Sequence, residues 1–187
     1  MFNKAVSCDL LWDSAAGEAV DSSQRWVLTA MQKHGPELVT MLWRILGNDQ
    51  DVCDAYQTTF LRLAHVENGR KPRHLKAYLF RTANNTAITM LRRRAVENRA
   101  LSGMENHPES APTIEADFDT QQLADKLRDH IAEVPEHFRT VVTLRDLGEL
   151  SYAEVAKIMG ISEGTARVYR CKAIALLATW MNKKDKS

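Results

Sequence analysis

The feature that most constrains this chain is the stretch from Leu150 to Leu177, which has the pattern of two helices joined by a sharp corner. Ser151 can cap the first helix. Apolar residues then recur at i, i+3, i+4 and i+7, the spacing of one buried helical face, and they are Tyr152, Val155, Ala156 and Met159. Gly160 then favours a left-handed helix end, because glycine has no Cβ to clash in that conformation. Ser162 follows as a residue whose hydroxyl can cap a second helix. The stretch therefore predicts one helix that ends at Gly160 and another that opens at Glu163.

The second helix of this stretch has apolar residues along one side and mostly basic residues along the other. This is the pattern of a helix-turn-helix, whose second helix enters the major groove of DNA. An ordinary helical hairpin with a solvated basic face shows a similar pattern, so periodicity alone leaves both interpretations open. The predicted inward stripe is Ala166, Tyr169, Ala173, Leu176 or Leu177, and Trp180, and the predicted outward residues are Arg167, Arg170, Cys171 and Lys172.

The residue choices within the motif are more specific than its periodicity. Four short segments resemble region four of bacterial sigma factors, and in particular that of the extracytoplasmic-function (ECF) class: Leu150-Ser151-Tyr152, Glu154-Val155-Ala156, Gly160-Ile161-Ser162 and Glu163-Gly164-Thr165. The resemblance implies that this region recognises the minus-thirty-five promoter element. It also implies that nine residues contact the DNA of this element: Ser162, Glu163, Gly164, Thr165, Arg167, Val168, Arg170, Cys171 and Lys172.

The recognition helix departs from the family at three positions. Arg170 stands where an apolar residue is usual, and Val168 and Tyr169 stand where small and basic residues are common. With Tyr169 inward and Arg170 outward, we expect a slightly rotated DNA-facing side. Thr165, Arg167 and Arg170 can then reach bases or phosphates, and arginine is the side chain that most often reads guanine.

The composition fits a helical protein whose charge is unevenly distributed. The 187 residues are 44% hydrophobic, enough for one medium core or two small ones, and alternating runs of β-branched residues are few, so we expect an all-α fold. The net charge of +1 argues by itself against a nucleic-acid protein. However, residues 70–99 hold nine Lys or Arg and one acid, whereas residues 100–119 hold five acids and no Lys or Arg. The near-neutral total therefore hides a basic segment that suits an anionic partner.

The N-terminal residues predict two short helices in succession. One helix is expected from Ser22 or Ser23 until residues 34–36, His-Gly-Pro, break it. Proline lacks the N–H that a helix interior needs but is favoured at a first helical position. We therefore expect Pro36 to open a second helix, which Gly47 ends.

The next helix carries a further family resemblance. Asn48 or Asp49 can cap it. Its polar side is explained equally well by exposure to solvent and by a binding partner. The segment from Gly47 to Leu63 is nevertheless similar to ECF region two, in which this helix docks on the β′ clamp helices of RNA polymerase. The resemblance implies core-polymerase contacts at Asp51, Asp54 and Gln57, opposite an apolar stripe of Val52, Tyr56, Phe60 and Leu63.

A basic loop and a long helix follow. Residues 65–74 carry turn signals at Asn68-Gly69 and Pro72, and a basic loop suits phosphate contact or the holding of an unstacked base. Residues 78–93 resemble the minus-ten reading helix of ECF factors, which with the loop before it opens the duplex and holds a flipped base. The residues implied at minus-ten DNA are Asn68, Arg70, Lys71, Arg73, Lys76, Tyr78, Arg81, Asn84, Asn85, Arg92 and Arg93.

Three residues of this helix depart from the family, with Tyr78 where Trp is usual, Asn84 where a basic residue is usual and Thr89 where Asp is usual. The preferred promoter sequence of the family therefore does not transfer to this chain.

The orientation of this helix follows from its periodicity. The predicted inward residues are Leu75, Leu79, Ala83, Ile88 and Leu91, and the predicted outward residues are Lys76, Arg81, Asn84, Asn85, Arg92, Arg93 and Arg94.

These observations divide the chain into two small helical domains joined by a flexible acidic linker. In residues 96–119 the apolar periodicity is lost and Pro108 and Pro112 appear, which is typical of a linker. The linker is either a passive tether or, by the family resemblance, a segment that threads the polymerase cleft with acids that mimic nucleic acid. The predicted parts are an N-terminal tail (1–21), sigma region two (22–95), the linker (96–119), sigma region four (120–182) and a basic tail (183–187).

The whole pattern resembles an ECF sigma factor, a non-enzymatic subunit that directs transcription initiation. The resemblance implies three partners: core RNA polymerase at its β′ clamp helices and β flap, promoter DNA, and an anti-sigma protein. The alternative within DNA binding is a polymerase-independent helix-turn-helix regulator, which leaves the Asp/Gln face and the basic segment unexplained. An enzyme is disfavoured because the six histidines lie in separate segments without a catalytic motif.

Cysteine usage and hydropathy set further expectations. Cys8, Cys53 and Cys171 are far apart and no histidine stands at metal-ligand spacing, so we expect no disulfide framework, metal or cofactor. No apolar run is long enough to cross a bilayer, and the N-terminus lacks a signal-peptide pattern. We therefore expect no membrane insertion and a cytoplasmic location.

Overall fold

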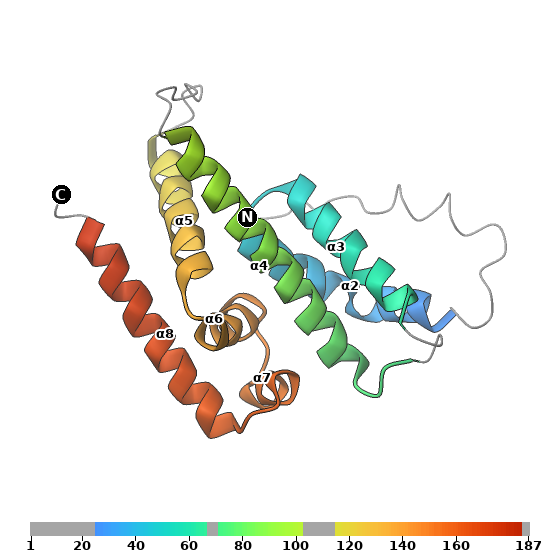
Figure 1. The fold of residues 1–187 in the computed structure, drawn as a ribbon. Helices are drawn as coiled ribbons and strands as arrows, with labels where there is room; N and C mark the ends of the chain where they lie inside the picture. Colours follow the sequence, from blue (N-terminus) through green and yellow to red (C-terminus); the bar gives the residue numbers. More distant parts are fainter. Residues whose placement is uncertain (1–24, 67–70, 103–114, 185–187) are drawn as a thin grey trace.

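A computed structural model describes residues 25–66, 71–102 and 115–184, and all its regular elements in these ranges are helical. The all-α prediction is confirmed. In Figure 1, α2–α4 form one group, here the N-terminal unit, and the elements from α5 to α8 form a second, the C-terminal unit. The elements are α2 (Arg25–Leu46), α3 (Asp49–Ala64), α4 (Leu75–Ser102), α5 (Glu115–Glu133), α6 (Glu136–Val142), the π-helical turn η3 (Thr143–Leu147), α7 (Tyr152–Met159) and α8 (Glu163–Lys184).

Helix α2 runs unbroken through Pro36, so the predicted break at residues 34–36 is wrong. Pro36 lies on the exposed side, whereas His34 and Gly35 face inward. A Cβ on Gly35 would lie 2.9 Å from the hydroxyl oxygen of Tyr56, so α2 and α3 approach closely here. An interior proline costs about 3 kcal/mol, and the packing of α2 on α3 and α4 offsets that cost.

Helix α3 begins as its sequence predicts. Asn48 is its N-cap, and the side-chain oxygen accepts a hydrogen bond from the backbone N–H of Asp51 at 2.8 Å. Of the predicted stripe, Val52, Phe60 and Leu63 are buried and Tyr56 is half-buried. The sequence therefore predicted both the start of α3 and the side that packs.

Helix α4 is the part of the N-terminal unit that faces the C-terminal unit (Figure 1), and it packs against α2 and α3 as well as α5, η3 and α7. It continues to Ser102, and α5 begins at Glu115, so both helices extend into the predicted linker. Residues 103–114 lie outside the described ranges. Of the predicted inward residues, Leu79, Ala83, Ile88 and Leu91 are buried and Leu75 is half-buried. A second stripe of Phe80, Asn84, Ala87 and Leu91 is buried too.

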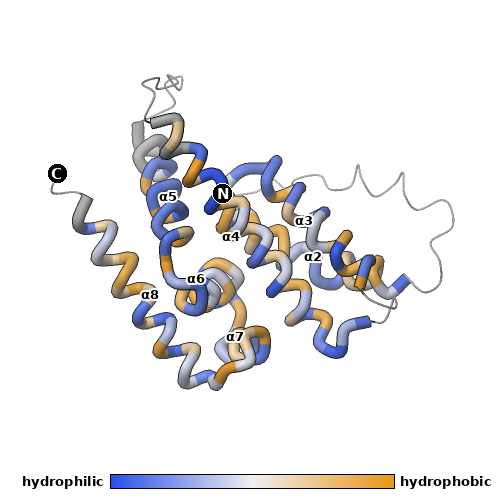
Figure 2. Tube along the Cα trace, viewed as in Figure 1, coloured by the Kyte–Doolittle hydropathy of each residue, from blue (hydrophilic) through white to orange (hydrophobic). Residues whose placement is uncertain are grey.

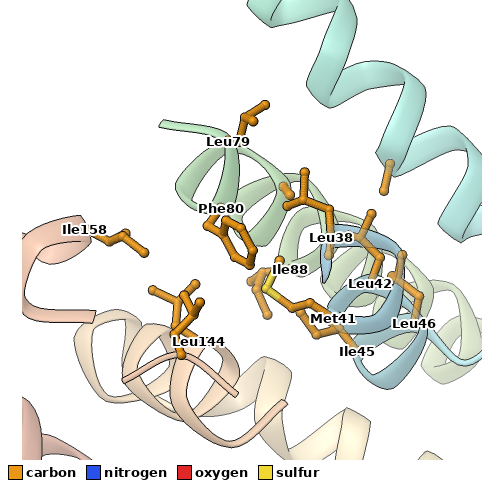
Figure 3. Close-up of a cluster of buried hydrophobic side chains, with 14 of the residues drawn as sticks. Leu38, Met41, Leu42, Ile45, Leu46, Leu79, Phe80, Ile88, Leu144 and Ile158 are labelled. Carbon is orange, nitrogen blue, oxygen red and sulfur yellow. The ribbon is translucent and has the colours of Figure 1, made fainter. Parts of the chain in front are cut away.

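The two units share one continuous hydrophobic core. Figure 3 shows Leu144 of η3 and Ile158 of α7 on the side of Phe80 and Met41, which belong to α4 and α2. In Figure 2, hydrophobic and hydrophilic residues alternate along the helices, as expected of amphipathic helices around a shared core. We call this packing of η3 and α7 against α2 and α4 the closed arrangement.

Polar contacts reinforce the closed arrangement. Arg44 of α2 donates to the backbone oxygen of Leu147 at 3.0 Å and pairs with Glu149 at 2.7 Å. Arg92 of α4 reaches the backbone oxygen of Ala132 at the end of α5, at 3.4 Å. The buried Arg139 of α6 donates to that same oxygen at 3.0 Å. Burial, together with the neighbouring Arg92, lowers the pKa of Arg139.

Candidate nucleic-acid and polymerase interfaces

The helix-turn-helix has its predicted caps. The hydroxyl of Ser151 accepts from the backbone N–H of Glu154 at 3.3 Å, and the carboxylate of Glu154 accepts from the backbone N–H of Ser151 at 2.9 Å. Gly160 adopts φ +69°, the left-handed conformation expected there. Ser162 accepts from the backbone N–H of Thr165 at 3.1 Å and so caps α8. The corner between α7 and α8 is therefore formed by the residues that the sequence predicted for it.

Helix α8 packs through its predicted stripe and leaves a continuous face exposed. Ala166, Ala173 and Leu177 are buried, and the ring of Tyr169 packs edge-on against Phe138 with centroids 5.2 Å apart. Of the nine predicted minus-thirty-five residues, Ser162, Glu163, Gly164, Arg167, Val168, Cys171 and Lys172 are exposed, and Thr165 and Arg170 are half-buried.

Arg167 presents the most accessible guanidinium of this face. Its side chain is 60% exposed and lies over the ring of Tyr152, with 4.3 Å between the guanidinium carbon and the ring centroid. Of the acids in the described ranges, Glu163 pairs with it, at 3.9 Å. Stacking on an aromatic ring orients the guanidinium while leaving its N–H groups free to donate. Sequence reasoning assigned Tyr152 only to the buried stripe and missed this support.

Arg170 has a different environment from Arg167. Its Nε lies 2.9 and 3.0 Å from the two carboxylate oxygens of Asp146, and its Nη2 lies 2.7 Å from one of them. Hydrogen bonding to Asp146 raises the pKa of Arg170. The predicted outward, DNA-reaching position of Arg170 therefore needs correction, since its guanidinium is held against η3. Asp146 is 24 residues away in sequence, and the only signal for the pair was the unusual arginine itself.

The predicted minus-ten residues fall into four groups, which are buried, half-buried, exposed and outside the described residues. Asn84 is 1% exposed and its side-chain oxygen has no hydrogen-bond partner, so its predicted outward orientation is wrong. The reason is the second buried stripe of α4, on which Asn84 follows Phe80 by one helical turn. Lys76 and Tyr78 are half-buried, Lys71, Arg73, Arg81, Asn85, Arg92 and Arg93 are exposed, and Asn68 and Arg70 lie outside the described residues.

Lys76 joins α4 to the helix-turn-helix. Its ammonium lies 2.8 Å from Glu154 of α7 and 3.0 Å from Glu37 of α2. Burial alone would lower the pKa of Lys76, but the two carboxylates raise it overall. The bond from Lys76, together with those from Ser151, lowers the pKa of Glu154 to about 2. Sequence analysis assigned Lys76 to DNA, whereas in the closed arrangement it bridges the two units.

A pocket of about 160 Å³ lies between α4 and the C-terminal unit. One wall carries Arg81 and Asn85, two of the predicted minus-ten residues. The opposite wall comes from α6 and α7 and includes His137, Thr140 and Met159. Part of the predicted DNA surface of α4 thus faces the other unit.

The predicted polymerase residues lie on α3. Asp54 and Gln57 are exposed. Asp51 is half-buried, and its carboxylate accepts a hydrogen bond from the side-chain nitrogen of Asn48 at 2.7 Å. Asp54 and Gln57 therefore form an accessible polar face, whereas Asp51 also supports the start of the helix.

The described residues contain neither a candidate metal site nor a candidate membrane-spanning helix. No group of three or more His, Cys, Asp or Glu within them is arranged to hold a metal ion. Among the helices in the described ranges, none has the length and apolar character required to cross a membrane.

Comparison with known proteins identifies the family. Residues 30–96 match the family model "Sigma-70 region 2", and residues 124–177 match "Sigma-70, region 4". The ECF RNA polymerase sigma factor SigE of Mycolicibacterium smegmatis is 28% identical over 139 residues, which cover 73% of this chain and 54% of that protein. The ferric citrate uptake sigma factor FecI of Escherichia coli K12 is 30% identical over 145 residues, which cover 75% of this chain and 82% of that protein.

A solved structure has the same fold. CnrH, in complex with the cytosolic domain of CnrY, superposes with a TM-score of 0.54 at 20% identity, covering 86% of this chain and 90% of CnrH. The matches to both regions, in their order along the chain, together with the relative at 30% identity, establish the family. The chain belongs to the extracytoplasmic-function (ECF) RNA polymerase sigma factors, alternative sigma factors that direct transcription initiation.

Proposed function

We propose that this sigma factor contacts minus-thirty-five DNA through α8, contacts minus-ten DNA through α4 and the loop before it, and docks on core polymerase through α3. The observation that carries the proposal is the exposed face around Arg167 on a fully capped helix-turn-helix. The exposed basic residues along α4 and the exposed Asp54 and Gln57 support the other two assignments. Each surface comes from a different helix, so each can be tested separately.

The test is run-off transcription with core polymerase from the promoter of the chain's own operon, preceded by gel filtration with the core enzyme. Co-elution and a promoter-specific transcript are expected. A folded chain that binds this DNA specifically but neither joins core polymerase nor supports transcription would favour the polymerase-independent regulator.

Replacing Arg167 with Ala tests the minus-thirty-five surface. We expect promoter binding by the holoenzyme to weaken by about 1–3 kcal/mol if Arg167 reads a base. The matched control is Lys157→Ala, which removes one exposed basic side chain from α7. Equal loss in both variants, measured by equilibrium binding to the promoter duplex, would remove Arg167 from the recognition surface.

The two proposed DNA surfaces lie too close together to bind both elements in the closed arrangement. The names minus-ten and minus-thirty-five place the two elements about 25 base pairs apart, which corresponds to about 85 Å of B-DNA. Helix α7 packs directly on α4, and α8 opens four residues after α7 ends. The eight residues of α7 and this connection together span at most about 30 Å. The proposed function therefore requires the two units to separate on the promoter.

Three further properties belong to this proposal. The chain acts in the cytoplasm, where transcription takes place, and it has no catalytic activity of its own. An anti-sigma protein controls its access to polymerase. The support for such a partner is the family resemblance and the structure of CnrH, which holds the cytosolic domain of another protein.

A further inference from the structure

Three arginines of the C-terminal unit surround one aromatic ring. The guanidinium carbons of Arg167 and Arg145 lie 4.3 Å and 5.0 Å from the centroid of Tyr152. Arg170 follows Arg167 by three residues on α8, a spacing that makes the two neighbours on the helix surface. The cluster is thus a concentrated source of positive charge at the edge of the proposed minus-thirty-five surface.

Two of the three guanidiniums are already engaged. Arg145 donates to the backbone oxygen of Leu150 at 3.0 Å. Arg170 makes a two-pronged contact with Asp146, with the shortest nitrogen–oxygen distance 2.7 Å. Within the described residues Arg167 has no ion pair this short, since the one it makes, with Glu163, measures 3.9 Å. The arginines therefore differ sharply in what they can offer to DNA.

The pair of Asp146 and Arg170 is placed to resist exchange with a phosphate. Both side chains are about two-thirds covered, with 30% and 33% of their surfaces exposed. Two-pronged pairs of arginine and carboxylate are among the stronger charged contacts. Moving Arg170 to a phosphate would also leave an unpaired carboxylate beside the DNA, which repels it. The contact with Asp146 therefore keeps Arg170 in place. Breaking it is also unfavourable because it would leave the Asp146 carboxylate unpaired beside the DNA.

We propose that Asp146 is a specificity-determining residue, which holds Arg170 off the DNA and leaves Arg167 as the arginine of this cluster that reads the minus-thirty-five element. The inference rests on the proposed role of α8. An additional arginine able to reach any phosphate would strengthen binding to all sequences alike. By neutralising Arg170, Asp146 limits binding to unrelated sequences. A larger part of the DNA-binding free energy then depends on the base sequence.

The main test is Asp146→Asn in the full chain bound to core polymerase. Binding is measured by fluorescence anisotropy from low to moderate salt, on the active promoter duplex and on the same duplex with the minus-thirty-five element scrambled. Asparagine keeps the shape of the side chain but removes its charge, so Arg170 is released. We expect severalfold tighter binding to the scrambled duplex, a salt dependence steeper by about one phosphate contact, and a severalfold smaller preference for the promoter.

Two further variants decide whether Arg170 is the cause. In Asp146→Asn combined with Arg170→Gln, the salt dependence should return to the wild-type slope. Arg170→Gln alone should leave that slope unchanged, whereas Arg167→Gln should lower the preference for the promoter over the scrambled duplex. Thermal unfolding of each variant separates loss of fold from loss of contact.

The outcomes that overturn the proposal are distinct. If Arg170→Gln lowers the salt slope by about one contact, Arg170 already touches DNA. If Asp146→Asn lowers the unfolding temperature but leaves the slope and the promoter preference unchanged, the pair is only a structural contact. Run-off transcription by the wild-type holoenzyme tests the proposed function separately, so a failure there is not confused with either result.

Discussion

At the scale of single residues, the most informative positions are those whose side chains have two possible partners. Lys76 can pair with Glu37 and Glu154, as it does in the closed arrangement, or with a phosphate. Arg170 has the same choice between Asp146 and DNA. In both cases a carboxylate of the protein forms an ion pair with a basic residue that the sequence assigned to DNA. The accessible charge of this protein is therefore smaller than its sequence indicates.

Glu154 makes one such contact measurable through pH. Its pKa is lowered from 4.5 to about 2 in the folded chain, so its contribution to stability is complete above pH 4.5 and is lost as the pH falls toward 2. The side chain is 39% exposed, so solvent screening reduces the contribution to about 1 kcal/mol. In Glu154→Gln, the free energy of unfolding should depend less steeply on pH across this window.

Urea denaturation of the full chain between pH 5 and pH 3 checks the expectation for Glu154. The control is Asp129→Asn, which removes an exposed carboxylate from α5. If both variants flatten the pH dependence equally, the bond to Lys76 has no special role in acid stability.

At the scale of secondary structure, local chemistry predicted the helix ends well. Asn48, Ser151 and Ser162 occupy the cap positions that their side chains favour, and Gly160 occupies the left-handed position that favours a residue without a Cβ. Each of these caps depends on residues within four positions, so a short stretch of sequence contains all the information. The same is true of the buried stripe of α8.

The failures at this scale have a common physical cause. The predicted break at Pro36 ignored the packing of α2 on two neighbouring helices, which outweighs the missing hydrogen bond. The predicted outward position of Asn84 assumed a single buried face on α4, whereas that helix is covered from two sides. Contacts between residues distant in sequence decide both cases, as they decide the pairing of Arg170 with Asp146. Periodicity within one helix contains no information about such contacts.

The two glycines of the helix-turn-helix allow a matched test of its corner. Gly160 has φ +69°, and a Cβ added to it would meet no atom within 4 Å, so Gly160→Ala costs only backbone strain, about 1–2 kcal/mol. Gly164 lies inside α8 without a positive φ, and Gly164→Ala should be neutral or stabilising by up to about 1 kcal/mol. Chemical denaturation of the two variants should therefore give changes of opposite sign or of clearly different size. Equal destabilisation would contradict the role assigned to the corner.

At the scale of the whole molecule, the closed arrangement and the proposed promoter-bound state differ in the distance between the two units. Spin labels can report this change when placed on Lys33→Cys of α2 and Lys157→Cys of α7, with the natural cysteines replaced by serine. Both positions are exposed. We expect one short distance in the free chain and an increase of tens of ångströms in the holoenzyme on its promoter. An unchanged distance in a transcribing complex would show that the units stay together.

The apolar side chains between the units add a dependence on temperature. Phe80, Met41, Leu144 and Ile158 belong to the shared core (Figure 3) and lie at the junction of the two units. Separation of the units would expose them to water unless polymerase covers them. Attraction between apolar surfaces weakens on cooling. Cold should therefore loosen the hold of one unit on the other, so that a chilled chain requires less help from polymerase to open than a warm one.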